Sequence, residues 1–315
     1  MYRKKIISRL ILLAFLMGVL MMNIVGCTKK DDNKDTGLLN IVATTTMLYD
    51  LAGVIGGDNV EVVALMGPGI DPHLYEASAG DITKMQEADV VLYNGLHLEG
   101  KMGEIFEKLE GKDKNIICIE KGIDHTKLLK DTENEGVVDP HIWFDVSIWI
   151  EAAEYVGEEL IKIDPDNKEE YQANLDKYLI ELEDLNTYVK NRALEVDKKQ
   201  RVLITAHDAF RYFGEAYEFE VKGLQGITTD MEAGTADVRE LATFITTNKI
   251  KAVFVESSVP TKNIEALQDA VKAQGFDVEI GGQLYSDSLG DKTTGDDTYI
   301  KTFKANIDTI VDALK

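Results

Sequence analysis

The side chains in this chain that could bind a metal ion are few, and two of them recur in one pattern. The tripeptide Asp-Pro-His occurs twice, ending at His73 and at His141, and a third histidine, His207, follows an apolar run. Imidazole is the side chain that most often binds transition metals near neutral pH. The chain has 5 histidines, and these three are far apart. They therefore predict one site assembled by folding rather than a local chelating motif.

Proline restrains the backbone before the first two of these histidines. It fixes its own φ angle and restricts the residue before it, so His73 and His141 would lose little entropy on binding an ion. After His141, the side chains of Trp143 and Phe144 could form a dry apolar wall. Asp145 is placed to cap a helix that starts at the next residue.

A divalent cation also requires negative charge, so we expect a carboxylate beside the imidazoles. Glu256 follows one predicted strand, and Asp287 lies beyond the next one. Position in the chain does not decide between these two. The remaining histidines are weaker candidates, because His125 lies in a charged, solvated stretch and His97 could be structural or could support the ligands from behind.

The elements that must position these residues alternate along the chain. Short β-branched runs alternate with helical patterns, which predicts an α/β fold of mainly parallel sheets. Predicted strands cover 39–43, 60–65, 90–93, 116–119, 202–205, 221–223, 252–255 and 278–280. Predicted helices cover 48–55, 82–87, 102–109, 209–217, 237–246, 264–273 and 299–314. His73 and His207 each fall between a strand and a helix, at the edge where open α/β sheets bind ligands.

One long amphipathic segment separates the first series of alternating strands and helices from the second. Apolar residues recur through 167–194 at spacings of three, four and one, which predicts a helix of about 40 Å at about 1.5 Å per residue. A coiled-coil oligomer is the alternative, but sustained heptads are missing. We expect a monomer with a rigid strut that resists wide hinge bending. The predicted boundaries are 38–165 for the N-terminal lobe, 166–195 for the linking helix and 196–315 for the C-terminal lobe.

The first residues have the pattern of a secretory signal. Four basic residues precede the apolar stretch 10–25, and Cys27 follows a small glycine, as in a bacterial lipobox. We therefore predict a lipoprotein signal peptide at 1–26, lipidation of Cys27 and a polar tether at 27–37. The anchor would hold the chain on the extracytoplasmic face of the cell membrane. A retained membrane helix is the alternative, because the apolar run is nearly long enough to span a bilayer.

The net charge argues against a nucleic-acid partner, and the cysteine content argues against an intrachain disulfide. Loss of the four basic residues with the signal peptide takes the formal net charge from −22 to −26, so we expect no nucleic-acid partner. The 315 residues suffice for two domains of ordinary size. If Cys27 is acylated, only Cys118 remains and no intrachain disulfide can form. Cys118 lies in an apolar run and is expected to be a core residue rather than a ligand.

In combination, several motifs resemble one family across essentially the whole mature chain. They are similar to the TroA-like, cluster A-I metal-receptor lipoproteins, the solute-binding proteins of bacterial manganese and zinc ABC transporters. The resemblance is carried by the segments 71–75, 94–99, 139–143, 206–210, 254–258 and 284–289. It implies that the metal ligands are His73, His141, His207 and Asp287. It also implies that Glu256 is a neighbour of the site, where it could orient His207 by a hydrogen bond.

The resemblance leaves two metals open. Three imidazoles and one carboxylate suit four-coordinate zinc, whereas a bidentate Asp287 would raise the coordination number and make manganese acceptable. Within the family, a manganese receptor has glutamate at the His207 position, and zinc receptors commonly have a long, acidic, His-rich loop. Here the corresponding stretch 124–135 contains only His125. The chain resembles the branch associated with both metals, and Mn²⁺ and Zn²⁺ are equal candidates for the transported ligand.

Two functions fit these observations. The leading one is a binding protein without catalytic activity, which captures the ion between two lobes and delivers it to an ABC transporter permease. Motion of the loops carrying Asp287 or His207 would release the ion. The alternative is a secreted zinc-dependent hydrolase with Glu256 as general base, but the sequence has no His-Glu-x-x-His motif and no nucleophile elbow. Cell adhesion would concern the outer faces and could coexist with transport.

Overall fold

The computed structural model describes residues 37–112, 114–131 and 136–315. The predicted signal peptide at 1–26, the predicted lipidation site Cys27 and all of the predicted tether except Gly37 lie outside these residues. Residues Leu38–Lys315 pack as one compact unit. Within the described part of the chain, no helix combines the length and the apolar character needed to cross a membrane.

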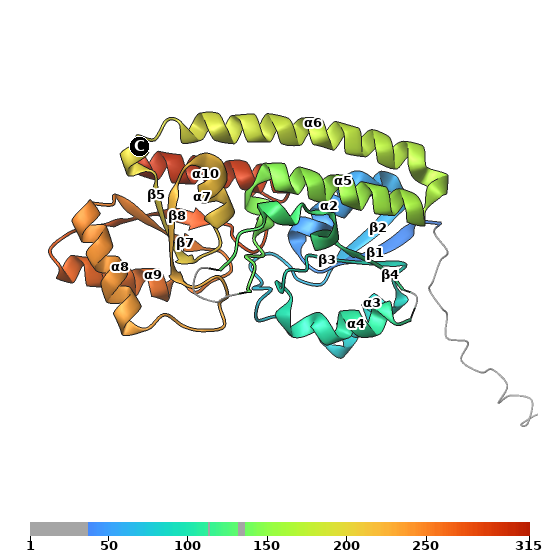
Figure 1. Ribbon diagram of the computed structural model, residues 1–315, viewed down its shortest axis with the longest axis horizontal. Coiled ribbons are helices and arrows are strands. Elements are labelled where there is room, and N and C mark those ends of the chain that lie inside the picture. Colours follow the sequence, from blue (N-terminus) through green and yellow to red (C-terminus); the bar gives the residue numbers. More distant parts are fainter. Residues whose placement is uncertain (1–36, 113, 132–135) are drawn as a thin grey trace, which may run out of the picture. The chain divides into compact units, whose positions relative to one another are not determined.

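The first sheet consists of four parallel strands in the order β2-β1-β3-β4 (Figure 1). The strands are β1 (Leu39–Ala43), β2 (Val60–Ala64), β3 (Val90–Tyr93) and β4 (Asn115–Cys118). They are connected by the helices α2 (Thr46–Gly56), α3 (Ala79–Glu87) and α4 (Gly103–Glu110). The two central strands β1 and β3 are largely buried, whereas the edge strand β2 alternates between half-buried and exposed residues. This pattern is expected where helices cover both faces of a parallel sheet.

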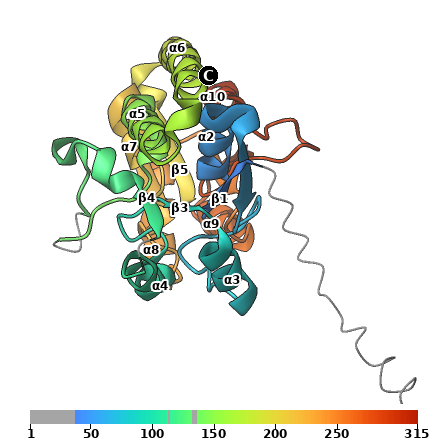
Figure 2. The same ribbon diagram turned by 90° about the vertical axis from the view of Figure 1, so that its right-hand side faces the viewer.

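Alternate side chains of the first sheet enter two different cores. Ile41 and Ala43 of β1 face the helices α2 and α5 (Val146–Ile163), and Val42 faces the side of α3 and α4. Figure 2 shows α3 and α4 on the side of this sheet opposite to α2 and α5. The period of two along a strand thus builds a three-layered lobe.

Polar side chains cap the starts of α2, α3 and α5. Ser78 and Asp81 form the reciprocal capping box at α3, and the side chain of Asp145 accepts a hydrogen bond from the backbone of Ser147 at the start of α5. The predicted cap by Asp145 is therefore confirmed. This cap fixes where α5 begins, directly after the segment that carries His141.

The second lobe contains parallel strands as well, but they form two pairs instead of one sheet. β5 (Val202–His207) pairs with β6 (Glu220–Gln225), and β7 (Ala252–Glu256) pairs with β8 (Glu279–Leu284). β5 and β7 lie side by side, and the side chain of Glu256 joins their carboxyl ends by accepting a hydrogen bond from the backbone N–H of His207. The helices of this lobe are α7 (Arg211–Tyr217), α8 (Thr235–Asn248), α9 (Lys262–Ala273) and α10 (Tyr299–Leu314).

The helix α6 (Lys168–Ala193) has 26 residues and runs alongside α5 and α10 (Figure 1). At about 1.5 Å per residue it is about 39 Å long. Its buried stripe consists of Tyr171, Leu175, Tyr178, Leu182, Leu185, Val189 and Ala193. Near its end, Arg192 contacts Asp308 and Asp312 of α10. The predicted fold is therefore confirmed: two α/β lobes with parallel strands, joined by one long helix.

Candidate metal centre

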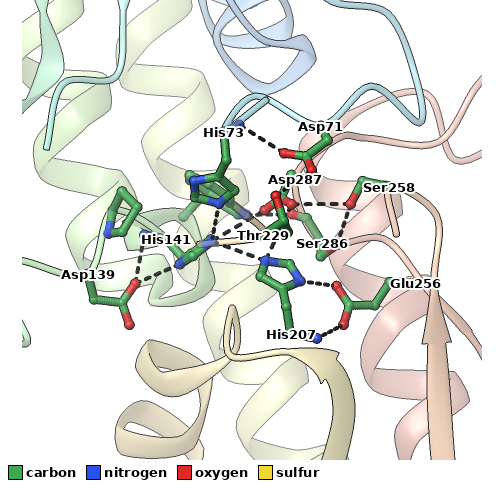
Figure 3. A network of polar contacts seen from close by, with 12 residues as sticks. Asp71, His73, Asp139, His141, His207, Thr229, Glu256, Ser258, Ser286 and Asp287 are labelled. Atoms are coloured by element: carbon green, nitrogen blue, oxygen red, sulfur yellow. Dashed lines mark hydrogen bonds and ion pairs between the residues drawn. The ribbon is translucent and has the colours of Figure 1, made fainter. Parts of the chain in front are cut away.

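Four side chains from four distant segments converge between the lobes (Figure 3). His73 lies between β2 and α3, His141 lies between β4 and α5, His207 is the last residue of β5, and Asp287 follows β8. One ligand atom of each residue lies within 4.8 Å of the others. All four are buried, with at most 4% of each residue exposed. The structure thus brings together the residues that the family resemblance implies as ligands.

Four of the distances between these ligand atoms, two of which involve different oxygens of Asp287, are those expected around one metal ion. Nε2 of His141 lies 3.3 Å from Nε2 of His73 and 3.4 Å from Nε2 of His207. Oδ1 of Asp287 lies 3.4 Å from Nε2 of His141, and its Oδ2 lies 3.4 Å from Nε2 of His207. In a regular tetrahedron, metal–ligand bonds of about 2.0–2.1 Å separate the ligand atoms by about 3.3–3.4 Å. The four side chains therefore fit one divalent ion.

Hydrogen bonds behind two of the rings determine which nitrogen faces the centre. Nδ1 of His141 lies 2.7 Å from Oδ1 of Asp139, and Nδ1 of His207 lies 2.6 Å from Oε2 of Glu256. A carboxylate can only accept a hydrogen bond, so each Nδ1 carries a proton. In the neutral rings, each Nε2 then presents a lone pair to the centre. Glu256 lies beside the site, but the contact of Asp139 with the ring of His141 was missed from the sequence.

The repeated Asp-Pro-His tripeptide folds in the same way at both positions. Oδ1 of Asp71 accepts a hydrogen bond from the backbone N–H of His73 at 2.9 Å, and Oδ1 of Asp139 accepts one from that of His141 at 3.0 Å. An aspartate that accepts from the backbone two residues later forms an Asx turn. With the intervening proline, this turn fixes the backbone of each histidine before any ion binds.

The charges around the three imidazoles favour a cation. Burial opposes protonation of His141, but the carboxylates of Asp139 and Asp287 together outweigh it and raise the pKa of His141 to about 9. The pKa of His207 is likewise raised against the effect of burial, chiefly by Glu256. Burial lowers the pKa of His73 to about 3, which keeps this ring neutral. A divalent ion would thus displace protons from two of its three nitrogen ligands.

The carboxylate of Asp287 is ionised although it is buried. Burial would raise its pKa, but the nearby imidazoles of His207 and His141 hold the pKa well below its usual range. Its Oδ1 has no hydrogen-bond partner among the described residues. A buried, charged oxygen without such a partner is costly, and coordination of a metal ion would satisfy it. The chemistry of these donors therefore fits a divalent cation.

Two residues of α7 connect the second lobe to the segment before His141. The hydroxyl of Tyr212 donates to the backbone oxygen of Asp139 at 2.9 Å and accepts from the backbone N–H of Leu129 at 3.0 Å. The guanidinium of Arg211 lies 3.7 Å from Oδ2 of Asp139 and donates to the backbone oxygen of Lys130. His141 is thus held by both lobes, through contacts that were not predicted from the sequence.

The turn at 94–99 supports the segment of His141 from within the first lobe. Buried Glu99 accepts hydrogen bonds from the hydroxyl of Thr44 and from the backbone N–H of Asn94. The side chain of Asn94 donates to the backbone oxygen of Pro140, next to His141, at 3.2 Å. His97, in the same turn, is exposed and lies outside the group of candidate ligands.

Two other sequence candidates lie away from the centre. His125 is exposed, as expected for a solvated residue. Cys118 is the last residue of β4 and is 3% exposed, so its prediction as a core residue is confirmed. Neither belongs to the group of candidate ligands.

Comparisons with known proteins agree with this geometry. Residues 41–313 match the family model described as zinc-uptake complex component A, periplasmic. The zinc-binding protein TroA of Treponema pallidum is 47% identical over 274 residues, which cover 87% of this chain and 88% of that protein. Its solved structure has a TM-score of 0.86 and covers 88% of this chain and 99% of that one, at 46% identity.

Two further relatives are similar over most of their length. The manganese-binding lipoprotein MntA of Bacillus subtilis is 46% identical over 277 residues, 88% of this chain and 90% of that protein. The metal ABC transporter substrate-binding lipoprotein of Lactococcus lactis is 30% identical over 310 residues, 96% of this chain and 97% of that protein. The chain therefore belongs to the zinc-uptake complex component A family, the TroA-like group that its motifs resemble.

Proposed function

We propose that this protein is an extracytoplasmic receptor that captures one divalent metal ion, Mn²⁺ or Zn²⁺, and delivers it to the permease of an ABC transporter. The proposed ligands are His73, His141, His207 and Asp287, with Glu256 orienting His207. The names of its relatives support this function. One is a zinc-binding protein, one is a manganese-binding lipoprotein, and one is a metal ABC transporter substrate-binding lipoprotein.

The observation that carries the proposal is the convergence of the three Nε2 atoms. Nε2 of His141 lies 3.3 Å from Nε2 of His73 and 3.4 Å from Nε2 of His207, so the three ring nitrogens are directed at one shared point. A divalent ion there would displace the protons of His141 and His207 and bind the lone pairs that they leave. The buried carboxylate of Asp287 supplies the negative charge that a divalent ion needs.

A receptor fits the site better than a hydrolase. The four side chains would fill all four positions around a zinc ion, whereas a catalytic zinc keeps one position open for water. The carboxylate of Glu256, which a hydrolase would use as general base, is occupied by the backbone N–H and the ring of His207. The relatives give no support to a hydrolase.

We place the mature chain at the outer face of the membrane, anchored by a lipid on Cys27 after removal of 1–26. Two relatives that are named lipoproteins support this location. We also propose that 38–165 and 196–315 act as the two lobes of a monomeric receptor and that 166–195 connects them.

The function can be tested by metal analysis and calorimetry. Protein purified without added metal and then loaded should hold one Mn²⁺ or Zn²⁺ per chain. Asp287→Ala should weaken binding at least about 100-fold, since even residues that only support a ligand contribute about 10- to 100-fold. His125→Ala is the matched control and should bind as the wild type does. Unchanged affinity in Asp287→Ala would contradict the proposed site.

A further inference from the structure

His73 lacks the support that the other two imidazoles receive. Asp139 and Glu256 each contact a ring nitrogen of the histidine that they orient. Among the described residues, no carboxylate forms a hydrogen bond or an ion pair with the ring of His73. Its backbone N–H donates instead to Oδ1 of Asp71 at 2.9 Å (Figure 3). The position of this ligand therefore depends on the turn that Asp71 forms.

The other oxygen of Asp71 is bound by the second lobe. Oδ2 accepts a hydrogen bond from the hydroxyl of Thr229 at 2.6 Å. Thr229 is buried, so water competes little for its hydroxyl. Hydrogen bonds to a charged acceptor are stronger than those between neutral groups. One carboxylate thus connects the second lobe to the backbone of a ligand that belongs to the first.

The loop that carries Thr229 is itself fixed beside another ligand. At its start, the backbone oxygen of Gly226 accepts from the backbone N–H of Asp208, the residue after His207, at 3.2 Å. The side chain of Gln225, at the end of β6, donates to a backbone oxygen within the loop at 3.0 Å. The hydroxyl of Thr229 is therefore held in a fixed place relative to the ligand of the second lobe.

We propose that Thr229 is a positioning residue for His73 and that its hydrogen bond to Asp71 sets how fast the bound ion leaves. This inference rests on the proposed function. An ion leaves the centre when a ligand moves away from it. Movement of His73 and its turn away from the second lobe must break the bond between Asp71 and Thr229. That bond therefore adds to the barrier for release.

Entry of the ion does not depend on the same bond. The centre must be open while the ion enters, and the bond across the lobes can form afterwards. Its loss should therefore raise the dissociation rate and leave the association rate unchanged. A second bond across the lobes, from the backbone N–H of Gly69 to the hydroxyl of Ser288 at 2.8 Å, would still hold the segment of His73. The loss of Thr229 should thus loosen this segment without detaching it.

The experiment compares Thr229→Val with a control one residue away. Valine keeps the branched shape of threonine but has no hydroxyl. The dissociation rates of Zn²⁺ and Mn²⁺ are each measured with an excess of a chelator that changes colour when it binds the ion. We expect both rates to rise about tenfold, the lower end of the effect of residues that support metal ligands, because Thr229 acts through Asp71. Thr229→Ser should restore slow dissociation, and Thr228→Val, at the exposed neighbouring threonine, should dissociate as the wild type does.

A second measurement tests whether the effect passes through Asp71. Asp71→Ala removes the acceptor of the same hydrogen bond. Adding Thr229→Val to Asp71→Ala should therefore change the dissociation rates no further, whereas two independent contributions would multiply. If Thr229→Val does not fold, Thr229→Ala removes the same hydroxyl and should give the same increase.

The possible outcomes separate the two proposals. Wild-type protein that binds neither metal would overturn the proposed function and this inference with it. Wild-type binding together with unchanged dissociation rates in Thr229→Val would overturn the inference alone. An equal increase in Thr228→Val would also overturn it, as would an effect of Thr229→Val that persists in Asp71→Ala, because neither would depend on the bond between Thr229 and Asp71.

Discussion

Two of the candidate ligands are each held by a carboxylate that contacts both the backbone and the ring. Glu256 accepts from the backbone N–H of His207 at 2.8 Å and from its Nδ1 at 2.6 Å. Asp139 does the same for His141 at 3.0 and 2.7 Å. Such partners fix the orientation of a ligand and increase its basicity. The affinity of the centre therefore depends on residues that do not touch the ion.

Glu256→Gln should weaken metal binding about 10- to 100-fold, the usual effect of losing a partner of a ligating histidine. The amide keeps the shape of the side chain but has only one acceptor atom, so it cannot accept from both nitrogens of His207. Calorimetric titration with Zn²⁺ measures the effect. Glu279→Gln, an exposed change on β8, is the control, and equal affinities in the two variants would contradict this role of Glu256.

At the scale of single residues, sequence reasoning reached the four residues that converge but not all of their supports. His73 and His141 stood out by the repeated tripeptide, whereas Asp287 was chosen over Glu256 only by family resemblance. The role of Asp139 could not be predicted, because identical tripeptides make different contacts in different surroundings. Oδ2 of Asp71 accepts from Thr229 of the other lobe at 2.6 Å, and no such partner distinguishes the copies in the sequence.

At the scale of elements, the predicted strands and helices agree with the structure to within a few residues, except where packing overrides local preference. The last strand was predicted as 278–280, but β8 continues to Leu284 through Gly281 and Gly282. Glycine is rare in strands, so the strand pattern in the sequence stops before these two glycines. A Cβ at Gly281 would lie 2.6 Å from Cβ of Ala313. The glycine thus permits close packing of α10 on β8, a contact that the sequence does not reveal.

The junction of α2 and α10 contains a buried carboxylate outside the metal centre. Asp50 on α2 accepts a hydrogen bond from the backbone N–H of Tyr299, the first residue of α10, at 2.9 Å. Burial, with a smaller contribution from Asp297, raises the pKa of Asp50 from 3.8 to about 6, against the effects of this hydrogen bond and of Lys301. The folded chain therefore binds a proton at Asp50 more tightly than the unfolded chain does.

Asp50→Asn should stabilise the protein above pH 6 and leave it unchanged near pH 4. Between pH 3.8 and 6, the stability contributed by wild-type Asp50 falls as the pH rises, because the unfolded chain releases this proton while the folded chain still holds it. Above pH 6 the ionised carboxylate costs up to about 3 kcal/mol, at about 1.4 kcal/mol per pKa unit. Asparagine carries no charge and can still accept from Tyr299.

Urea denaturation of the metal-free protein between pH 4 and 8 measures this difference. Asp58→Asn, in the exposed turn after α2, is the control and should follow the wild type at every pH. A difference between Asp50→Asn and the wild type that does not change with pH would show that the effect is not due to ionisation.

At the scale of the whole described unit, the two lobes share one hydrophobic core, which the sequence pattern did not predict. The pattern predicted two lobes and a connecting helix, but one hydrophobic cluster contains residues of α2 and α5 from the first lobe, of α6, and of α7 and α10 from the second. Contacts across the centre add to it, including a hydrogen bond from the backbone of Gly69 to the hydroxyl of Ser288. Long-range packing of this kind depends on tertiary arrangement, which periodicity along one segment does not encode.

This shared core predicts that metal release involves the loop of Asp287 and not a hinge in α6. Amide hydrogen exchange with and without Zn²⁺ should show metal-dependent protection at 285–290 and around His73. Amides of α6 should exchange equally slowly in both states, because its buried stripe and its contacts with α5 and α10 do not involve the ion. The helix α8, which lies on the outer side of the second lobe in Figure 1, serves as the internal reference. Faster exchange within α6 in the metal-free protein would instead mean that the long helix bends when the ion leaves. The lobes would then have to separate against the packing of Tyr178 and Leu182, which are buried in the common cluster.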